Sequence, residues 1–301
     1  MISISVPAST SNFGSGFDAF GLALNLYNQF YVSFSDSYEV LIEGEGQHLP
    51  KDESNLFVRV YRSACQRLGV EERPISVRQV NHVPTARGLG SSSTAIVGGI
   101  LACGRLHGLK LSLEEVLGLA FEFEPHPDNL LPALLGGFVV CANSEEGINF
   151  LKLDFPRELK VVVCVPDFEL STERARAVIR REVSLRDAVY NLQRSALLVG
   201  ALLSCNFELM KEAVKDKLHQ PYRAELIPGF WQVVEEAYKS GAKAVFLSGA
   251  GPSVASLCKD GADQIGRAMV EAFSKAGVSS KHLILSASEK GALVSDESSN
   301  P

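Results

Sequence analysis

Apolar and polar positions alternate in several short stretches and recur at helical spacing in longer ones, which predicts a chain of mixed strands and helices. Strands are predicted at residues 2–6, 30–34, 38–42, 75–80, 137–142, 159–165, 244–247 and 282–287. Helices are predicted at residues 54–68, 91–107, 171–181, 185–203, 207–217, 229–239 and 262–276. Ser54 is expected to cap the first helix, and Ser112 with Glu115 forms a capping-box pattern that opens one more. The polar tail from Ser295 to Pro301 is expected to be disordered.

Length and composition narrow the class of protein. The chain has 301 residues, of which 46% are hydrophobic and 21% charged, so it can bury a core without the help of a metal or disulfide. A chain of this length is expected to form about two domains. We place the boundary between Lys152 and Lys160, which divides the chain into residues 1–155 and 156–301.

The charge balance and the cysteine spacing exclude other classes. Lys and Arg number 29 against 35 Asp and Glu, a net charge of −6, whereas a nucleic-acid binder carries a strongly basic surface. No apolar stretch reaches the roughly 20 residues of a membrane span, and the N-terminus has no secretory pattern. The six cysteines include no CxxC pair, which favours buried thiols in a reducing compartment over a disulfide framework or a zinc site. We therefore expect a cytoplasmic enzyme that binds neither nucleic acid nor membrane.

A glycine-rich segment, residues 84–94 (PTARGLGSSST), lies between a predicted strand and a predicted helix. Gly88 and Gly90 let the backbone turn tightly and approach a ligand closely. The serines that follow lie in the first helical turn, whose free backbone N–H groups and dipole favour an anion. An ordinary serine cap after a glycine turn explains the segment equally well. The segment is neither a Walker A motif nor a GxGxxG motif.

Further segments carry candidate chemistry. Glycines and polar side chains gather at residues 11–18 (SNFGSGFD) and 247–253 (LSGAGPS), although a surface loop and a hairpin turn explain each one alone. Residues 122–129 (EFEPHPDN) end a predicted helix and include two glutamates that can bind a hard cation. Residues 171–176 (STERAR) and 219–223 (HQPYR) supply arginines, which grip carboxylates with paired donors but are most often solvated surface charges.

Taken together and in order, these segments resemble the GHMP kinase superfamily, and within it the homoserine kinases. Three segments match the superfamily motifs, at residues 9–18, 84–92 and 248–253. Two more are similar to homoserine kinases in particular: residues 126–137, with the pattern HPDNxxPAxxGG, and residues 219–223, with the sequence HQPYR. The resemblance covers essentially the whole chain.

The resemblance implies a two-domain α+β fold. Its N-terminal domain is similar to domain 2 of ribosomal protein S5, with a left-handed βαβ crossover, and its C-terminal domain is ferredoxin-like. The resemblance also implies ATP and L-homoserine as substrates and Mg²⁺ as the metal. The product would be O-phospho-L-homoserine for threonine biosynthesis, and a homodimer is compatible with the family.

The resemblance further implies roles for individual residues. The nucleotide would be bound at its adenine base by Asn55 and at its phosphates by the glycine-rich segment, through Pro84, Arg87, Gly88, Leu89, Gly90, Ser91, Ser92 and Ser93. Mg²⁺ would be held by Ser92 and Glu124, which form the catalytic set together with Asn129. The amino group and hydroxyl of homoserine would be surrounded by Asn12, Asp18 and Asn129, and its carboxylate by Thr172, Arg176 and Arg223.

Several points stay open at this stage. Pro125 stands where the family often has glycine, so Glu122 competes with Glu124 as the metal ligand. His126 is interpreted as structural, and Asp128 caps the following segment as readily as it joins the site.

The reaction and the substrate leave alternatives too. An amide such as Asn129 cannot accept a proton, so we expect phosphoryl transfer without a dedicated protein base. A GHMP kinase of another small alcohol, such as mevalonate or a sugar, is the alternative function, and Arg176 with Arg223 argues for an amino acid instead. An inactive family member is a further alternative, against which the retained metal and substrate residues argue.

Overall fold

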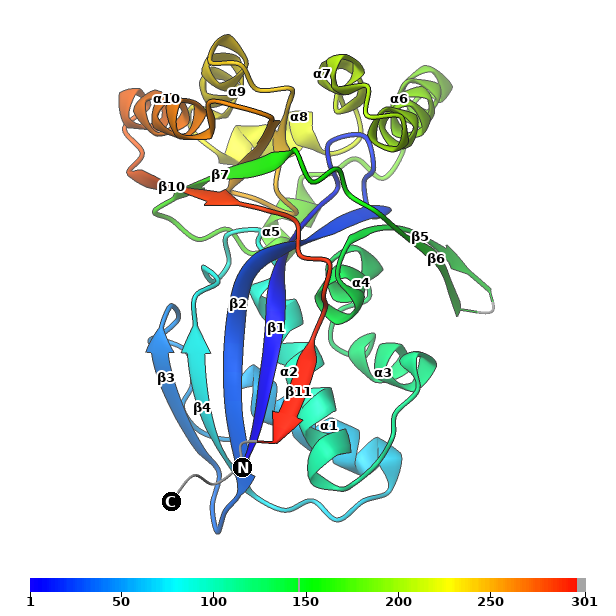
Figure 1. The fold of residues 1–301 in the computed structure, drawn as a ribbon, viewed down its shortest axis with the longest axis vertical. Coiled ribbons are helices and arrows are strands. Elements are labelled where there is room, and N and C mark those ends of the chain that lie inside the picture. The colour runs from blue at the N-terminus through cyan, green and yellow to red at the C-terminus, as the bar shows by residue number, and fades with distance from the viewer. Residues whose placement is uncertain (146, 297–301) are drawn as a thin grey trace.

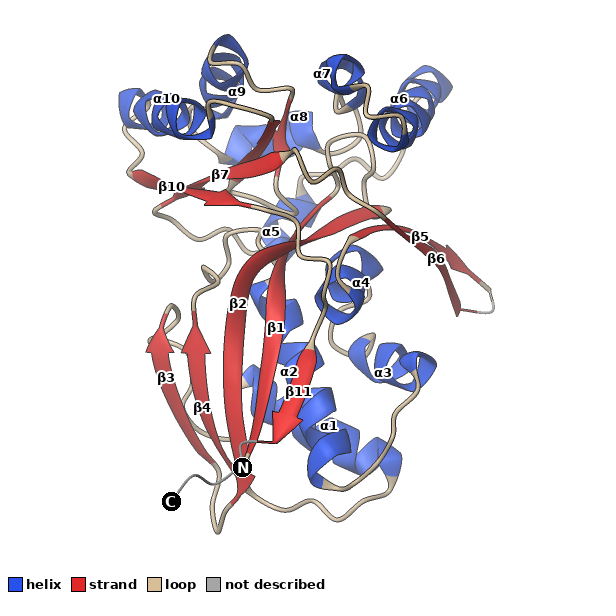
Figure 2. Cartoon of the chain, viewed as in Figure 1, coloured by secondary structure: helices blue, strands red, loops and turns tan. Residues whose placement is uncertain are grey.

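The computed structural model describes residues 1–145 and 147–296, which form two sheets with helices packed against them (Figures 1 and 2). The strands are β1 (Ile2–Ser11), β2 (Phe20–Phe34), β3 (Glu39–Gly44), β4 (Ile75–Asn81), β5 (Phe138–Ser144), β6 (Gly147–Leu153), β7 (Lys160–Pro166), β8 (Ala244–Leu247), β9 (Val254–Cys258), β10 (Ser280–Leu285) and β11 (Leu293–Asp296). The helices are α1 (Leu56–Leu68), α2 (Ser91–Leu106), α3 (Leu113–Ala120), α4 (Pro127–Leu135), α5 (Thr172–Ala177), α6 (Leu185–Leu203), α7 (Met210–Ala213), α8 (Gln220–Arg223), α9 (Phe230–Lys239) and α10 (Ala262–Lys275).

The first sheet contains strands from both ends of the chain. Its order is β11-β1-β2-β4-β3, and the β5–β6 hairpin pairs with the beginning of β2. β2 is long enough to pair with three neighbours, because its first half contacts β1 and β5 and its second half contacts β1 and β4. The helices α1 and α2 pack on one face of this sheet (Figure 1).

The crossover between β3 and β4 has the unusual hand that the resemblance implied. These two strands pair in parallel and are connected through α1. In Figure 1 both strands point upward, and the chain passes from β3 behind the sheet to β4 on its right, which is a left-handed connection. Nearly all βαβ units are right-handed, so this crossover is a strong marker of the fold.

The second sheet has the ferredoxin-like arrangement that the resemblance implied. Its order is β10-β7-β9-β8, and all its neighbours are antiparallel. Counted along the chain, this is the order 4-1-3-2 with helices between the first and second strands and between the third and fourth, the split βαβ pattern. The helices α6, α7, α9 and α10 lie above this sheet in Figure 1.

The two halves share part of their core. One hydrophobic cluster combines residues of the first sheet with residues of the second. At its centre the fully buried ring of Phe13 stacks on Phe246 at 4.5 Å and meets Phe138 edge-on at 5.3 Å. The boundary at residues 155/156 stays a prediction, and β11 returns from the second half of the chain to the first sheet.

Several local predictions need correction. β2 begins at Phe20 rather than near residue 30, and the sequence patterns missed β6, β9 and β11. The helix predicted at 207–217 is only a 3-10 turn at Phe207–Leu209 followed by α7. Ser295 was expected in a disordered tail, but it pairs with β1; residues 297–301 lie outside the described part of the chain.

Helix caps give one confirmation and one correction. The Ser112–Glu115 capping box is confirmed, because both of its reciprocal hydrogen bonds form. The cap of α1 is Asn55, not Ser54: its side chain accepts a hydrogen bond from the N–H of Phe57. In residues 1–145 and 147–296, no helix combines the length and apolarity needed to cross a membrane.

Candidate active site

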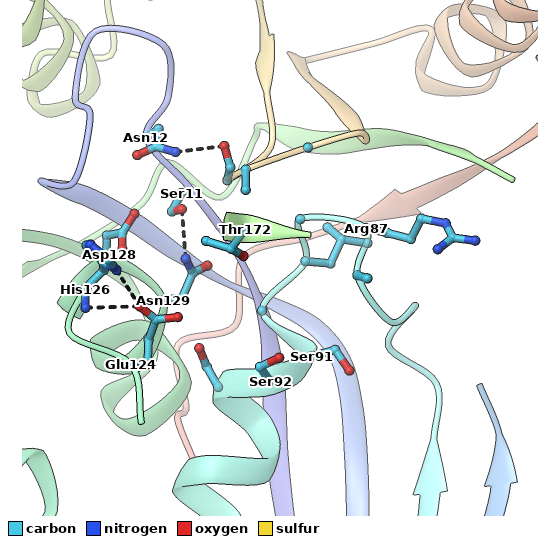
Figure 3. A pocket seen from close by; sticks show the side chains of 18 of the residues that line it. Ser11, Asn12, Arg87, Ser91, Ser92, Glu124, His126, Asp128, Asn129 and Thr172 are labelled. Atoms are coloured by element: carbon cyan, nitrogen blue, oxygen red, sulfur yellow. Dashed lines mark hydrogen bonds and ion pairs between the residues drawn. The ribbon is translucent and has the colours of Figure 1, made fainter. Parts of the chain in front are cut away.

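A cavity opens where the two halves of the chain meet (Figure 3). It is bounded by the end of β1, the glycine-rich segment, the start of α4, the helices α5 and α8, and the turn between β8 and β9. Most of the predicted site residues line it: Asn12, Asp18, Arg87, Gly88, Leu89, Gly90, Ser91, Ser92, Ser93, Glu124, Asn129, Thr172, Arg176 and Arg223. Pro84 and Asn55 lie outside this lining.

The glycine-rich segment presents backbone rather than side chains to the cavity. Gly90 caps α2 in the left-handed conformation, and no side chain caps this helix, so the first N–H groups of α2 are open to a ligand. A Cβ at Gly88 would lie 2.1 Å from the carbonyl oxygen of Ser248, and one at Gly90 would lie 2.1 Å from Ser9 Oγ. Both positions therefore require glycine, and the helix dipole favours an anion at this end.

The turn between β8 and β9 supports the glycine-rich segment from the other half of the chain. Ser248 Oγ donates a hydrogen bond to the carbonyl oxygen of Gly88 at 2.7 Å, and the hydroxyl of Thr10 lies 2.8 Å from the same Ser248 Oγ. Three of the motifs noted in the sequence thus meet in one hydrogen-bonded group. The hairpin-turn interpretation of residues 247–253 is correct as well, because β8 and β9 pair directly.

Glu124, not Glu122, enters the cavity. Figure 3 shows Glu124 and Ser92 facing the same space from opposite sides. The carboxylate of Glu122 turns to α1 instead, where Arg67 lies 2.8 Å away and Ser63 donates to it at 3.0 Å.

His126 contacts the carboxylate of Glu124 through two nitrogens. The backbone N–H of His126 donates to Glu124 Oε1, and its ring nitrogen Nδ1 lies 2.5 Å from the same oxygen. Oε2 has no hydrogen bond within the described residues and stays available to a ligand. The structural interpretation of His126 is therefore consistent with its contacts, because they orient a cavity-lining carboxylate.

Asn129, in the first turn of α4, is fixed by two serines of β1. Ser9 Oγ donates to its amide oxygen at 2.9 Å, and its amide nitrogen donates to Ser11 Oγ at 3.1 Å (Figure 3). These contacts orient the amide and leave one of its two N–H groups for a ligand.

Asp18 and Arg176 form an ion pair across the cavity. The two guanidinium nitrogens lie 2.7 and 3.1 Å from the two carboxylate oxygens, which is the bidentate geometry typical of strong pairs. Asp18 has φ +57° and Asn12 has φ +70°, uncommon for residues other than glycine. The loop is held in this conformation because Asn12 accepts from the N–H of Asp18 and donates to the carbonyl of Gly249.

Arg223 is buried without a carboxylate partner in the described structure. Its guanidinium donates to the carbonyl oxygens of Ala175 and Gly249 and to His219 Nδ1. His219 Nε2 lies 2.8 Å from the carbonyl of Gly14, so Nε2 carries the proton and Nδ1 accepts. Burial lowers the pKa of His219 to about 4, which keeps it neutral beside the arginine.

The charge of Arg223 is held at an electrostatic cost. Burial, and secondarily the nearby Arg176, lower its pKa to about 10, so it remains charged at neutral pH. His219 and the carbonyl oxygens of Ala175 and Gly249 thus form a socket that holds the guanidinium in place.

Asp128 lines the cavity too, although its sequence context left it open between a helix cap and a site role. It is 3% exposed, and its Oδ1 has no hydrogen-bond partner among the described residues. Burial, and then the nearby charge of Asp18, raise its pKa to about 6. The available sequence signal was its place between His126 and Asn129, but a cap at the start of α4 explained that place equally well.

A second cavity of about 410 Å³ adjoins the first on the far side of the glycine-rich segment. Both cavities are lined by Ser91 and Ser92. Asn55 lines the second cavity. Its side-chain nitrogen donates a hydrogen bond to the carbonyl of Pro50, and its side-chain oxygen accepts from the N–H of Phe57 and from the side chain of Gln79. An adenine contact of Asn55 therefore stays a prediction.

Arg87, Leu89 and Pro84 support the segment rather than facing a ligand with their side chains. The guanidinium of Arg87 points away from the cavity in Figure 3 and donates to the carbonyl oxygens of Pro166 and Thr85. Leu89 is buried in the shared core. Pro84 lines a separate surface hollow.

Comparison with known proteins agrees with this geometry. The family of GHMP kinases N terminal domains matches residues 55–137, and the family of GHMP kinases C terminal domains matches residues 190–275. The homoserine kinase of Aquifex aeolicus is 54% identical over 295 residues, which cover 98% of this chain and 99% of that protein. The homoserine kinase of Persephonella marina is 43% identical over 97% of both chains.

A solved structure extends the agreement to three dimensions. The crystal structure of homoserine kinase from Cytophaga hutchinsonii matches with a TM-score of 0.87 and 31% identity, covering 98% of this chain and 97% of that chain. Near-complete coverage in sequence and in structure, together with both domain matches, places this chain among the homoserine kinases of the GHMP kinase family.

Proposed function

We propose that this chain transfers the γ-phosphoryl group of ATP to the side-chain hydroxyl of L-homoserine, giving O-phospho-L-homoserine for threonine biosynthesis. The reaction would take place in the cytoplasm, as expected from the sequence. The observation that carries the proposal is the charge pattern of the cavity beside the glycine-rich segment. One buried carboxylate, Asp128, and one buried guanidinium, Arg223, have no hydrogen-bonded partner of opposite charge within the described residues.

The two unpaired charges match the two charges of an α-amino acid. Asp18 and Arg176 already neutralise each other through their bidentate pair. Arg223 and Asp128 are the buried charges that remain, so the substrate carboxylate would bind Arg223 and its ammonium would bind Asp128. This refines the expectation from the resemblance, which gave the ammonium to Asp18. Burying an ion without a partner is costly, so a zwitterion that supplies both partners is favoured.

The residues around Glu124 fit a hard divalent cation. A free carboxylate oxygen and the Ser92 hydroxyl are oxygen donors of the kind Mg²⁺ prefers, and they border the open end of α2. Bound there, Mg²⁺ would neutralise charge on the phosphates. The chain itself would contribute the N–H groups of Ser91 to Ser93, which bind phosphate oxygens through backbone alone.

The phosphoryl transfer needs positioning more than covalent chemistry. The homoserine oxygen forms a bond to the γ-phosphorus as the bond to the β–γ bridging oxygen breaks. The free N–H of Asn129 would orient that hydroxyl oxygen, because Ser9 and Ser11 fix the amide. The hydroxyl proton would leave to the transferred phosphate or to water.

A substitution series at Asn129 tests the absence of a protein base. Asn129→Ala should lower kcat about 100-fold through loss of orientation, and Asn129→Asp should not exceed the wild-type rate. An aspartate variant that is well above wild type would contradict transfer without a base.

An ADP-release assay with Mg-ATP tests the substrate. L-homoserine is expected to exceed L-serine, mevalonate and galactose by at least about 100-fold in kcat/KM. 4-Hydroxybutyrate lacks the ammonium and 3-aminopropan-1-ol lacks the carboxylate, so each should lose a large part of that rate. Turnover of mevalonate or galactose without turnover of L-homoserine would contradict the proposed substrate and leave a kinase of another alcohol.

We infer that a second copy of this chain covers the exposed face of α6. Large apolar side chains recur along this face at helical spacing, with Leu185 81%, Leu192 69% and Leu203 61% exposed. In an antiparallel pairing about a twofold axis, Leu185 would face the partner copy's Leu203, and Leu192 would face a small residue, Ala196. Large and small side chains would thus interdigitate.

Sedimentation velocity tests this homodimer. The wild type should be dimeric at micromolar concentration, and Leu192→Glu should be monomeric. Leu151→Glu, at an equally exposed leucine on β6, is the matched control and should stay dimeric. A monomeric wild type, or a dimer unaffected by Leu192→Glu, would contradict the inference.

A further inference from the structure

Two cysteines and one histidine outside the kinase cavity form a compact cluster between α1 and α2. Cys65 Sγ lies 3.4 Å from Cys103 Sγ and 3.8 Å from His107 Nε2. The three ligand atoms all lie within 4.8 Å of one another. Both cysteines are buried, and His107, at the end of α2, is partly exposed. The phosphoryl-transfer scheme uses none of these residues.

We propose that Cys65, Cys103 and His107 bind a thiophilic divalent cation of the Zn²⁺ class. Two thiolates and an imidazole are a common part of zinc ligand sets. Metal bonds of about 2.3 Å to sulfur and about 2.0 Å to nitrogen place tetrahedral donors roughly 3.5–3.8 Å apart. The observed separations of 3.4 and 3.8 Å already agree with that spacing to within a few tenths of an ångström.

Charge favours a divalent ion over a monovalent one in this place. Two thiolates and a neutral imidazole carry two negative charges, which a divalent ion cancels completely. An electroneutral complex is the form that an apolar core accepts at least cost. The surroundings are apolar, because both cysteines belong to the main hydrophobic cluster of the first half.

A fourth donor and an entry path are also present. Tyr61 Oη lies 3.3 Å from His107 Nε2, and its proton is donated to the carbonyl of Arg73 at 3.0 Å. The lone pairs of that oxygen therefore remain free for the cluster, or a water can take the fourth position. Because His107 is partly exposed, an ion can reach the thiols from its side.

The cluster would fasten one end of each of two helices whose other ends border the two cavities described above. α1 and α2 pack closely, since a Cβ at Gly99 would lie only 2.7 Å from the carbonyl oxygen of Phe57. They run in the same direction, because the start of α1 contacts α2 at Gly99 and its end contacts α2 further along, at Cys103. Asn55 caps the first of these helices beside the second cavity, and Gly90 caps the other at the phosphate end. A metal bond between the opposite ends would hold the two helices as one unit.

The test measures metal binding by the full-length, reduced protein with Zn²⁺ and Cd²⁺ alone as probes. The wild type should retain about one equivalent of either ion after gel filtration, and Cd²⁺ should produce the ultraviolet thiolate charge-transfer band. Zn²⁺ should also raise the unfolding midpoint by roughly 5 °C. Cys65→Ala and His107→Phe should each lower the affinity at least about tenfold. His107→Phe serves as the milder change, because its position is partly exposed.

Matched controls separate this site from others in the chain. Cys258→Ala removes a buried thiol elsewhere and should leave the stoichiometry intact. Glu124→Gln removes the proposed Mg²⁺ ligand and should leave the charge-transfer band intact.

Three outcomes would overturn the proposal. The first is a wild type that binds neither ion while all its thiols titrate after unfolding. The second is a Cys65–Cys103 disulfide found by peptide mapping of protein purified without reductant. The third is undiminished affinity in His107→Phe.

Discussion

The two ends of the cavity differ in the groups that they offer to a ligand: backbone N–H groups at one end and buried ionisable side chains at the other. At the end proposed to bind the nucleotide phosphates (the phosphate end), the chain offers backbone N–H groups at the start of α2, and Gly88 and Gly90 leave no room for a side chain. At the end proposed to bind the amino acid (the amino-acid end), the chain offers buried ionisable side chains from distant segments, among them Asp128 and Arg223. Backbone donors suit any nucleotide, whereas placed charges select one kind of acceptor. The proposed selectivity for the amino acid therefore rests on the placed charges and not on the backbone donors.

The two ends also differ in their effect on stability. Glycines at the phosphate end fit their surroundings without buried charge. At the amino-acid end, the raised pKa of Asp128 and the lowered pKa of Arg223 show that burial disfavours the charged form of both groups. Keeping them charged in the folded protein therefore costs free energy. Removing a charge there should therefore weaken function and strengthen the fold, as is common at functional sites.

The largest expected effect is at the phosphate end. Gly88→Ala should lower kcat/KM for both substrates by about 1,000-fold or more, because its Cβ would collide with the carbonyl oxygen of Ser248 and displace the segment. Steady-state kinetics measure this. Gly69→Ala is the control: its φ is +67° but a Cβ there meets nothing within 4 Å. It should cost about 1 kcal/mol of stability and leave activity unchanged. Equal kinetic losses in both variants would contradict the steric explanation.

The next effect separates the two substrates. Arg223→Lys should raise the KM for L-homoserine about 100-fold. A lysine cannot both keep the hydrogen bonds to the two backbone carbonyls and bind the substrate carboxylate with paired donors. The KM for ATP should change by less than about threefold. Arg194→Lys changes an arginine that pairs with Glu212 outside the cavity and should alter neither value. A parallel rise in both KM values would show that the two ends do not act separately.

Asp128→Asn should lower kcat/KM for L-homoserine about 30-fold through loss of the ammonium partner. In the wild type, kcat/KM should fall as pH drops below about 6, because the carboxyl becomes protonated; in the variant this decrease should be absent.

The same substitution also tests the free energy of unfolding. The folded-state pKa is above the unfolded value, so the destabilisation by this group grows as pH rises from about 4 to 6 and is complete above.

Chemical denaturation at two pH values measures that stability change. At pH 7 Asp128→Asn should raise the free energy of unfolding by about 3 kcal/mol, and below pH 4 this gain should vanish. Asp216→Asn is the contrasting control, because that carboxylate accepts hydrogen bonds from Asn191 and from the N–H groups of residues 218–220. It should destabilise the protein at pH 7. A destabilised Asp128→Asn would contradict the view that this charge opposes folding.

The smallest expected effect is at the support of the phosphate end. Ser248→Ala removes one hydrogen bond to the carbonyl of Gly88 and should raise the KM for ATP about fivefold, with the KM for L-homoserine unchanged. Ser253→Ala, in the same turn, removes a buried hydroxyl that has no partner among the described residues and should be neutral. If both variants behave alike, the Ser248 contact does not position the segment.

The sequence predicted the geometry of the phosphate end better than the geometry of the amino-acid end, for a physical reason. A glycine turn before a helix is a local pattern, and its backbone donors follow from residues 88–93 alone. The Asp18–Arg176 pair joins residues that only the fold brings together, so its mutual neutralisation was invisible in the sequence. The role proposed for Asp128 depends on which charges near it are already paired, and no spacing rule contains that information.

The fold shows the same division between local and distant information. The capping box at Ser112 and the amphipathic helices were predicted because their signals lie within a few residues. The strand β9 is buried along its whole length and so lacks the alternation that marks a half-buried strand. β11 is four exposed residues, and its strand state comes from pairing with β1.

The position of β11 has a consequence for how the protein is made. During translation β1 and β2 leave the ribosome early, but the neighbour that covers the outer edge of β1 at Ile2–Ser5 is synthesised only after the whole second sheet. Until then β1 is an open strand edge, the kind of surface that invites pairing with other chains. The first half of the chain therefore cannot complete its fold before the second half is synthesised, because its sheet needs β11 from the C-terminal end.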